Sequence, residues 1–288
     1  MGLWAFIRSG RGKRPVTHVS DAERFSFTPF TRHAFFTDVN RWIVERVVQP
    51  SRRLVVDLGC GPGAVTKLIV ERLGDVPDAR VIGIDPEPSA IAKARAAVSA
   101  RIADFLEGSA ECLSRLVSRA DAVLFLNAIH LVPDKAAVIS EVRKVLNQGG
   151  VFGFNTTFFA GAYPEGTASF WRRWIVRSVQ WLKERGITVQ HTHAGRATAM
   201  QWLSPEDYAR LCVAAGFARP TMDFVPVEMT AESLRDIGHF SLFIEGALPG
   251  VPLELGAEAL DEGLARTMNE LGIDRVRRNW LEVVAIAA

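Results

Sequence analysis

The stretch Val55-Val56-Asp57-Leu58-Gly59-Cys60-Gly61-Pro62-Gly63-Ala64 decides the fold that this chain is expected to adopt. A β-branched run ends in an acid, three alternating glycines follow, and the next residues carry apolar side chains at helical spacing. This order predicts a strand, a tight turn and a helix, which form the opening unit of a doubly wound α/β sheet. Glycine suits the turn because it has no Cβ to prevent a sharp bend or the close approach of a ligand.

Two residues of this loop argue against a dinucleotide cofactor. The glycines satisfy the loose pattern G-x-G-x-x-G/A, which alone is a weak signal. Asp57, placed just before them, would repel a pyrophosphate but could lie close to a cationic ligand. Pro62 removes one backbone N–H that a phosphate would otherwise use. We therefore rank a nicotinamide or flavin dinucleotide well below a cofactor that carries positive charge.

The run D-L-G-C-G-P-G at residues 57–63 resembles motif I of the class I S-adenosylmethionine (SAM) dependent methyltransferases, of the type that acts on small molecules. In that family the loop cradles the methionine part of SAM, whose ammonium and sulfonium groups are positive. The resemblance implies a Rossmann-like, doubly wound α/β sheet, mostly parallel with an antiparallel last strand, and SAM as the cofactor. The cofactor contacts that it implies in this loop are Asp57, Gly59, Cys60, Gly61 and Gly63.

A second acid follows the next predicted strand, Arg80–Asp85. Asp85 lies 22 residues beyond Gly63, which suits a carboxylate that hydrogen-bonds a ribose. The run G-I-D-P-E-P-S-A-I at residues 83–91 also resembles the methyltransferases, where this acid takes both ribose hydroxyls and Pro86 would lie beside it. The alternative is a helix-capping Asp before Pro86.

Three further cofactor contacts are expected at the ends of the next strands. The family usually has an Asp where Ser109 stands, bonding the adenine amino group, so that here a serine or the backbone beside Ala110 must replace it. Asn127 follows the apolar strand 122–126, at the carboxyl edge of the sheet where ligands of α/β proteins bind. The resemblance extends from about residue 52 to residue 156, and beyond that it is one of layout.

Histidines are the candidates for a catalytic base, which methyl transfer needs only if the acceptor must lose a proton. His130 follows the strand that ends at Leu126, and His191 and His239 lie in later insertions; His193 and Glu245 are further candidates. A structural role is the alternative for each of them. The H-x-H pair at 191–193 has no carboxylates nearby in the sequence, so we expect no metal site.

The domain layout is expected to be a lid at residues 1–50 and a SAM-binding domain at 51–288, with helical lid insertions at about 157–203 and 229–276. Trp171 and Trp174 belong to a broad apolar surface on a helix expected at 168–185, which packs on the core or walls a substrate pocket. The other helices are expected to follow the glycine loop and to span about 87–98, 135–146, 204–216 and 257–271, with further strands at 102–107, 151–155, 219–227 and 280–286.

Composition restricts the partners. The 288 residues carry a net charge of +2, too small to indicate a nucleic-acid partner, and no apolar run approaches the ~20 residues of a membrane span. Three dispersed cysteines are typical of a reducing cytoplasm. The apolar and then basic residues 1–14 are either a frayed terminus or a weak contact with a membrane surface or an acidic partner. The second insertion is either a substrate wall or a homodimer contact.

Three functions remain open on the sequence. The first is methyl transfer from SAM to an apolar or aromatic small molecule, which the 17 Phe and 7 Trp and both insertions favour. The second is a protein or RNA methyltransferase, against which the charge balance and the absence of an Asn-Pro-Pro-Tyr type of motif argue. The third is a SAM-binding protein without methyl transfer, since a binding motif does not prove catalysis.

Overall fold

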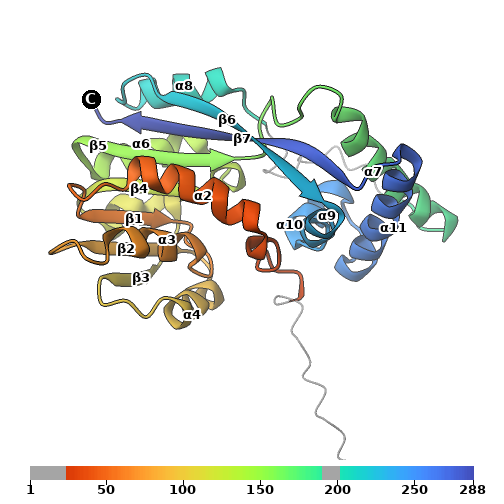
Figure 1. Cartoon of the computed structure of the whole chain (residues 1–288), viewed down its shortest axis with the longest axis horizontal. Helices are drawn as coiled ribbons and strands as arrows, with labels where there is room; N and C mark the ends of the chain where they lie inside the picture. The colour runs from red at the N-terminus through yellow and green to blue at the C-terminus, as the bar shows by residue number, and fades with distance from the viewer. Residues whose placement is uncertain (1–23, 190–201) are drawn as a thin grey trace, which may run out of the picture.

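The computed structural model describes residues 24–189 and 202–288, which form a twisted sheet with helices on both faces and a helical cap at one end (Figure 1). The seven strands have the order β3-β2-β1-β4-β5-β7-β6. Their bounds are β1 Leu54–Leu58, β2 Arg80–Asp85, β3 Ala103–Glu107, β4 Ala120–Leu126, β5 Leu146–Thr156, β6 Thr221–Thr230 and β7 Arg275–Ile286. Strands β1 to β5 pair in parallel, and β7 runs antiparallel to both of its neighbours, as predicted.

Helices cover both faces of this sheet because the buried strands are apolar on both sides. The first face is covered by α2 (Ala34–Val47) and α3 (Ala64–Leu73), which share one apolar cluster with β1 and β4. The second is covered by α5 (Leu113–Leu116), α6 (Lys135–Val145) and α8 (Pro205–Ala214). Helix α4 (Pro88–Ala97) packs on β3 near the edge. This arrangement is the Rossmann-like fold that the sequence predicted.

Local sequence explains where several helices begin. Ser204 caps α8 in a reciprocal capping box with Asp207, and Pro205 occupies the first helical position. Asp134 caps α6 by accepting a hydrogen bond from the Ala137 backbone N–H. These contacts satisfy backbone donors that the helix itself leaves free.

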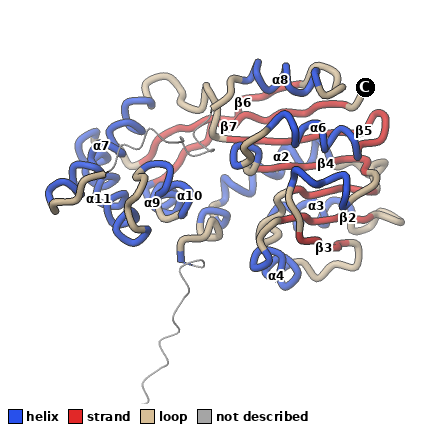
Figure 2. Tube along the Cα trace, turned by 180° about the vertical axis from the view of Figure 1, so that it is seen from behind, coloured by secondary structure: helices blue, strands red, loops and turns tan. Residues whose placement is uncertain are grey.

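The cap consists of α7 (Ala168–Glu184), α9 (Ala231–Gly238), α10 (Ser241–Ala247) and α11 (Leu253–Leu271). Strands β6 and β7 run on beyond the parallel strands and reach these helices, as the views from both sides show (Figures 1 and 2). The cap has its own apolar cluster, which includes Trp174, Leu260 and the N-terminal Phe25 and Phe30. It therefore forms a second core beside the core of the sheet.

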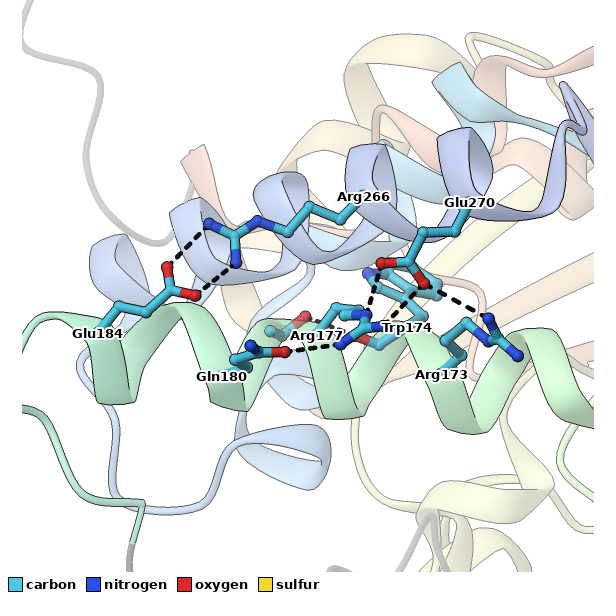
Figure 3. A network of polar contacts seen from close by, with 8 residues as sticks. Arg173, Trp174, Arg177, Gln180, Glu184, Arg266 and Glu270 are labelled. Carbon is cyan, nitrogen blue, oxygen red and sulfur yellow. Dashed lines mark hydrogen bonds and ion pairs between the residues drawn. The ribbon is translucent and has the colours of Figure 1, made fainter.

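Helices α7 and α11 lie side by side in the cap. Inside their contact, the Trp174 indole N–H donates to the Leu260 carbonyl at 2.8 Å. A Cβ added at Gly263 would lie 2.6 Å from the Ser178 backbone nitrogen, so this position requires glycine. At the surface, Arg266 pairs with Glu184, and Arg173 and Arg177 pair with Glu270 (Figure 3).

Two strands depart most from the sequence-based prediction: β5, expected at 151–155, spans Leu146–Thr156, and β7 begins earlier than expected. Strand β7 was expected at 280–286 but begins at Arg275, because it continues to pair with β6 from Asn279 back to Arg275. The arginines at 275, 277 and 278 concealed this part of the strand, since charged residues are not typical of strand interiors. No helix of the described residues is long and apolar enough to cross a bilayer.

Candidate functional site

The glycine loop between β1 and α3 has the backbone that its sequence predicted. Gly59, Gly61 and Gly63 have φ angles of 66°, 51° and 92°, a left-handed region that only glycine enters easily. The Cys60 N–H donates to the Ile84 carbonyl at 3.0 Å, and the Gly63 N–H donates to the Cys60 carbonyl at 3.0 Å. The loop is thereby fixed to the end of β2.

Asp57 lies beneath this loop rather than on its open side. Its side chain is 1% exposed and accepts a hydrogen bond from the Thr66 hydroxyl at 2.6 Å. Burial raises the pKa of Asp57 to about 7. Asp57 therefore joins the end of β1 to Thr66 of α3, and its contact with a ligand remains a prediction.

Asp85 faces the glycine loop from the carboxyl end of β2. Its Oδ2 accepts the Gly61 N–H at 2.8 Å, and its Oδ1 accepts the Glu87 N–H at 3.0 Å. One acid thus joins the loop to the start of α4, while it also lines a cavity of about 890 Å³. Part of its role is structural, and a hydrogen bond to a ribose remains a prediction.

The cavity begins at the carboxyl edge of the sheet. Of the ten cofactor contacts expected from the sequence, all but Asp57 and Gly63 line it; the eight that do are Gly59, Cys60, Gly61, Asp85, Pro86, Ser109, Ala110 and Asn127. Gly61 has no atom within 4 Å of an added Cβ, so this point of the loop is open. The acids that line the described cavity, Asp85, Glu87 and Glu111, all belong to this end.

Asn127 is held by a network of buried amides where β4 ends. Its φ of 55° is left-handed, a conformation that Asn tolerates better than most residues. Its backbone N–H donates to Asn155 Oδ1 at 2.8 Å, its Nδ2 donates to Asn40 Oδ1 at 2.9 Å, and its Oδ1 accepts the Trp280 indole N–H at 2.9 Å. These contacts fix the side chain between α2, β5 and β7.

From the sheet the cavity continues under the cap. Trp171 and Ile175 of α7 line it, as do Phe243 of α10 and Phe240 at the start of that helix. Trp174 does not line it and is buried against α11. The N-terminal segment contributes Phe25, Phe27, Phe30 and Phe36. Within the expected lid at residues 1–50, Phe30 lines the cavity, whereas Arg32 is exposed and Phe35 packs near Trp280.

A buried arginine lies at the cap end of the cavity. Arg278 of β7 is 4% exposed, and its guanidinium lies 4.5 Å from the ring centre of Trp171 and 5.0 Å from that of Phe158. Burial lowers the pKa of Arg278 to about 10, so it stays charged at neutral pH. Our sequence-based prediction missed this residue, although the alternation Val276, Arg278, Trp280 places it on the buried side of a strand.

His130 lies close to this arginine. It is 7% exposed, stacks on Phe158 at 4.3 Å between ring centres, and its Nδ1 lies 3.2 Å from the Thr156 hydroxyl. Burial and the positive charges of Lys135 and Arg278 lower the pKa of His130 to about 3. The imidazole is therefore neutral at pH 7 and a weak base, and a role in proton transfer remains a prediction.

The other two catalytic candidates are not placed in the cavity. His191, like His193, falls outside the described residues. His239 follows α9 and its Nε2 lies 2.9 Å from Asp261 Oδ2 of α11; it is not among the residues that line the cavity, although the adjacent Phe240 is. Among the described residues no cluster of His, Cys, Asp and Glu could hold a metal ion.

Comparison with known proteins agrees with this geometry. Residues 55–150 match the family model described as a methyltransferase domain. A trans-aconitate 2-methyltransferase of Methylobacterium radiotolerans is 37% identical over 110 residues, which are 38% of this chain and 40% of that enzyme. The chain thus matches less than half the length of such curated relatives.

Solved structures share the fold over more of the chain. A Haemonchus contortus phosphoethanolamine N-methyltransferase, solved with S-adenosylhomocysteine, superposes with a TM-score of 0.53 at 15% identity, covering 94% of this chain and 58% of that one. The [4+2]-cyclase SpnF superposes with a TM-score of 0.53 at 17% identity, covering 87% and 81%. The acid at the end of β2, the open glycine loop and the match over residues 55–150 together support the resemblance to the class I SAM-dependent methyltransferases, and the solved structures show that the fold is shared.

Proposed function

We propose that this chain transfers the methyl group of SAM to an apolar or aromatic small molecule bound under the helical cap. One observation carries the proposal: a single cavity extends from the glycine loop and Asp85 to the rings of Trp171, Phe240 and Phe243. A cofactor at the first end and an acceptor at the second would share one cavity. Large, mostly apolar cavities with a few polar groups are the usual sites of small ligands.

The residues of the sheet edge suit SAM as the group held there. Asp85, Glu87 and Glu111 supply negative charge for a ligand with cationic groups, and Asp85 offers a carboxylate to hydroxyl groups. When bound, SAM supplies an activated methyl group on a sulfonium centre. The protein then contributes mainly position, by holding an acceptor atom in line with that group.

The aromatic end suits an acceptor with an apolar body. Rings of Phe27, Phe158, Trp171 and Trp202 line it, and each presents a large surface with little conformational freedom to lose on binding. A neutral His130 could orient an acceptor by a hydrogen bond, and with its lowered pKa it is a poor proton acceptor. We infer that the acceptor loses no proton to His130 before methyl transfer.

The proposal takes the acceptor to be a free small molecule in the cytoplasm rather than RNA or protein. An 890 Å³ cavity enclosed by a cap favours this choice over a polymer. A homodimer and a place in secondary metabolism stay predictions from the sequence. The alternative is a SAM-binding protein without methyl transfer, which the shared fold of a [4+2]-cyclase keeps open.

Methyl-labelled SAM tests the proposal directly. The purified protein is incubated with labelled SAM and a cell extract of its source, and the label is separated into organic-soluble, water-soluble, RNA and protein fractions. We expect label in the small molecules. Label in RNA or protein would overturn the choice of acceptor, and no transfer by a protein that binds SAM would favour the alternative.

A further inference from the structure

Arg278 combines a buried charge with contacts that leave the charge unpaired. Its Nε donates to the Thr157 hydroxyl at 2.7 Å, and its Nη2 donates to the Thr157 carbonyl at 2.8 Å. Both acceptors are neutral, and Tyr163, the other polar neighbour, is a phenol. Within residues 24–189 and 202–288, no carboxylate forms an ion pair with Arg278.

Aromatic rings enclose the guanidinium and fix its position. Besides Trp171 and Phe158, the ring centres of Tyr163 and Trp202 lie 5.3 and 5.7 Å from its central carbon. Ring faces attract a cation, but less strongly than a carboxylate does. Burial of a cation without a counter-ion costs free energy. A ligand that brings a negative charge to a cation in a cavity wall offsets this cost.

The charged residues that line the described cavity differ between its two ends. Asp85, Glu87 and Glu111 lie near β2 and α4, where Lys93 also lines the cavity, whereas Arg278 lies at the cap end beside the rings of Trp171 and Phe158, with no acid among the lining residues there. Lys135 adds positive charge behind His130, where its ammonium group donates to the Val132 carbonyl. The cap end therefore favours an anionic ligand, because its positive charge has no acid beside it among the described lining residues.

We propose that Arg278 binds a carboxylate group of the acceptor, so that the substrate is an organic acid with an apolar or aromatic body. The inference rests on the proposed function, whose acceptor class it narrows. A guanidinium presents paired N–H groups that match the two oxygens of a carboxylate. The single arginine within apolar walls suits one such group better than a phosphate, which carries more charge.

Calorimetric titration of matched probe pairs tests this site without knowledge of the substrate. The protein, saturated with S-adenosylhomocysteine, is titrated with 2-naphthoate and with 2-naphthamide, and with benzoate and benzamide. Each pair shares its shape and differs in charge. We expect at least one acid to bind ten times or more tightly than its amide.

Two neighbouring arginines provide the matched variants. Arg278→Met should remove the preference for the acid, because the methionine keeps apolar bulk and lacks the charge. Arg277→Met should retain it, since Arg277 is exposed on the opposite side of β7. S-adenosylhomocysteine affinity, measured in the same experiment, should be unchanged in both variants and reports that the fold is intact.

The outcomes separate the two proposals. Equal affinity for acid and amide in the unchanged protein, or no binding of any acid while S-adenosylhomocysteine binds, overturns the role of Arg278. This comparison needs no variant and holds even if Arg278→Met fails to fold. Failure to bind S-adenosylhomocysteine at all would instead contradict the proposed function.

Discussion

The glycine loop and the helical cap show two different ways of building one cavity. The loop at residues 59–63 takes its shape from backbone conformation, with three left-handed glycines held by the end of β2. The cap takes its shape from side chains, with Trp174 and Leu260 inside the contact of α7 and α11. A loop of the first kind can be recognised from a few neighbouring letters, whereas a cap of the second kind depends on segments about 90 residues apart.

If the two regions are independent, the cap can be broken while cofactor binding survives. Gly263→Val would force side-chain atoms into the Ser178 backbone, already 2.6 Å from an added Cβ, and should cost about 3 kcal/mol of stability. Thermal unfolding should show the loss. Calorimetry at a temperature where the variant remains folded should show S-adenosylhomocysteine affinity within about twofold of the unchanged protein.

Ala265→Val is the matched control, because it places the same valine side chain at an exposed position of α11. Its effect should be limited to the lower helix propensity of valine, about 0.5 kcal/mol. Loss of cofactor binding in Gly263→Val alone would show that the cap and the sheet form one cooperative unit.

A change in the cofactor end of the cavity should weaken cofactor binding and leave the cap intact. Asp85→Ala removes a charged acceptor from the cavity and releases the Gly61 N–H, so SAM affinity should fall by about 1.5–3 kcal/mol. Isothermal calorimetry measures it directly. Asp104→Ala removes an exposed acid from the neighbouring strand β3 and should change nothing. Equal SAM affinity in the unchanged protein and both variants would contradict a hydrogen bond between Asp85 and the ribose.

The pH dependence of thermal stability tests the contribution of the buried acids. Glu282 of β7 is fully buried, neither of its carboxylate oxygens has a described hydrogen-bond partner, and burial raises its pKa to about 8. The folded state therefore holds a proton that the unfolded state releases above about pH 4.5. This stabilisation is lost as the pH rises toward 8, and Asp57, with a pKa of about 7, acts in the same direction.

We therefore expect the melting temperature to fall between pH 6.5 and 9, and to fall less in Glu282→Gln. His130 acts in the opposite direction only below its unfolded value near 6.5, since its folded pKa is about 3. Glu228→Gln, an exposed acid of the adjacent strand β6, is the control and should follow the unchanged protein. A flat profile, or one unaffected by Glu282→Gln, would contradict this assignment.

The smallest effect is expected at the surface of the cap. Glu270 pairs with Arg173 and Arg177 across the α7–α11 contact (Figure 3), but these side chains are about one-third exposed and water screens them. Glu270→Gln should lower the melting temperature far less than Gly263→Val, and 1 M salt should remove the difference from the unchanged protein. A loss as large as that of Gly263→Val would make charge, rather than packing, the basis of the cap.

Much of the sheet was predictable because its signals are local. The strand ending at Asp85 and the helix that follows the glycine loop agree with the structure within a residue or two, since apolar runs, glycines and capping residues act on their own neighbourhood. The start of β7 was not predictable in this way. Its first residues are charged, and only pairing with β6 shows them to be a strand.

The sequence by itself determined the α/β fold, the glycine loop and the placement of eight expected contacts on one cavity, because strand ends of a parallel sheet meet at one edge. Only the tertiary structure decided that Trp171 faces the cavity and that Trp174 is buried against α11. Helical spacing predicts which side of a helix is apolar, but it does not predict which element packs against that side. The tertiary structure also brought Arg278, remote from the loop in the chain, beside Trp171 and Phe158. Whether a charged side chain such as Arg278 can bind a ligand depends on the groups around it. Those groups come from distant segments of the chain, which no local sequence pattern connects.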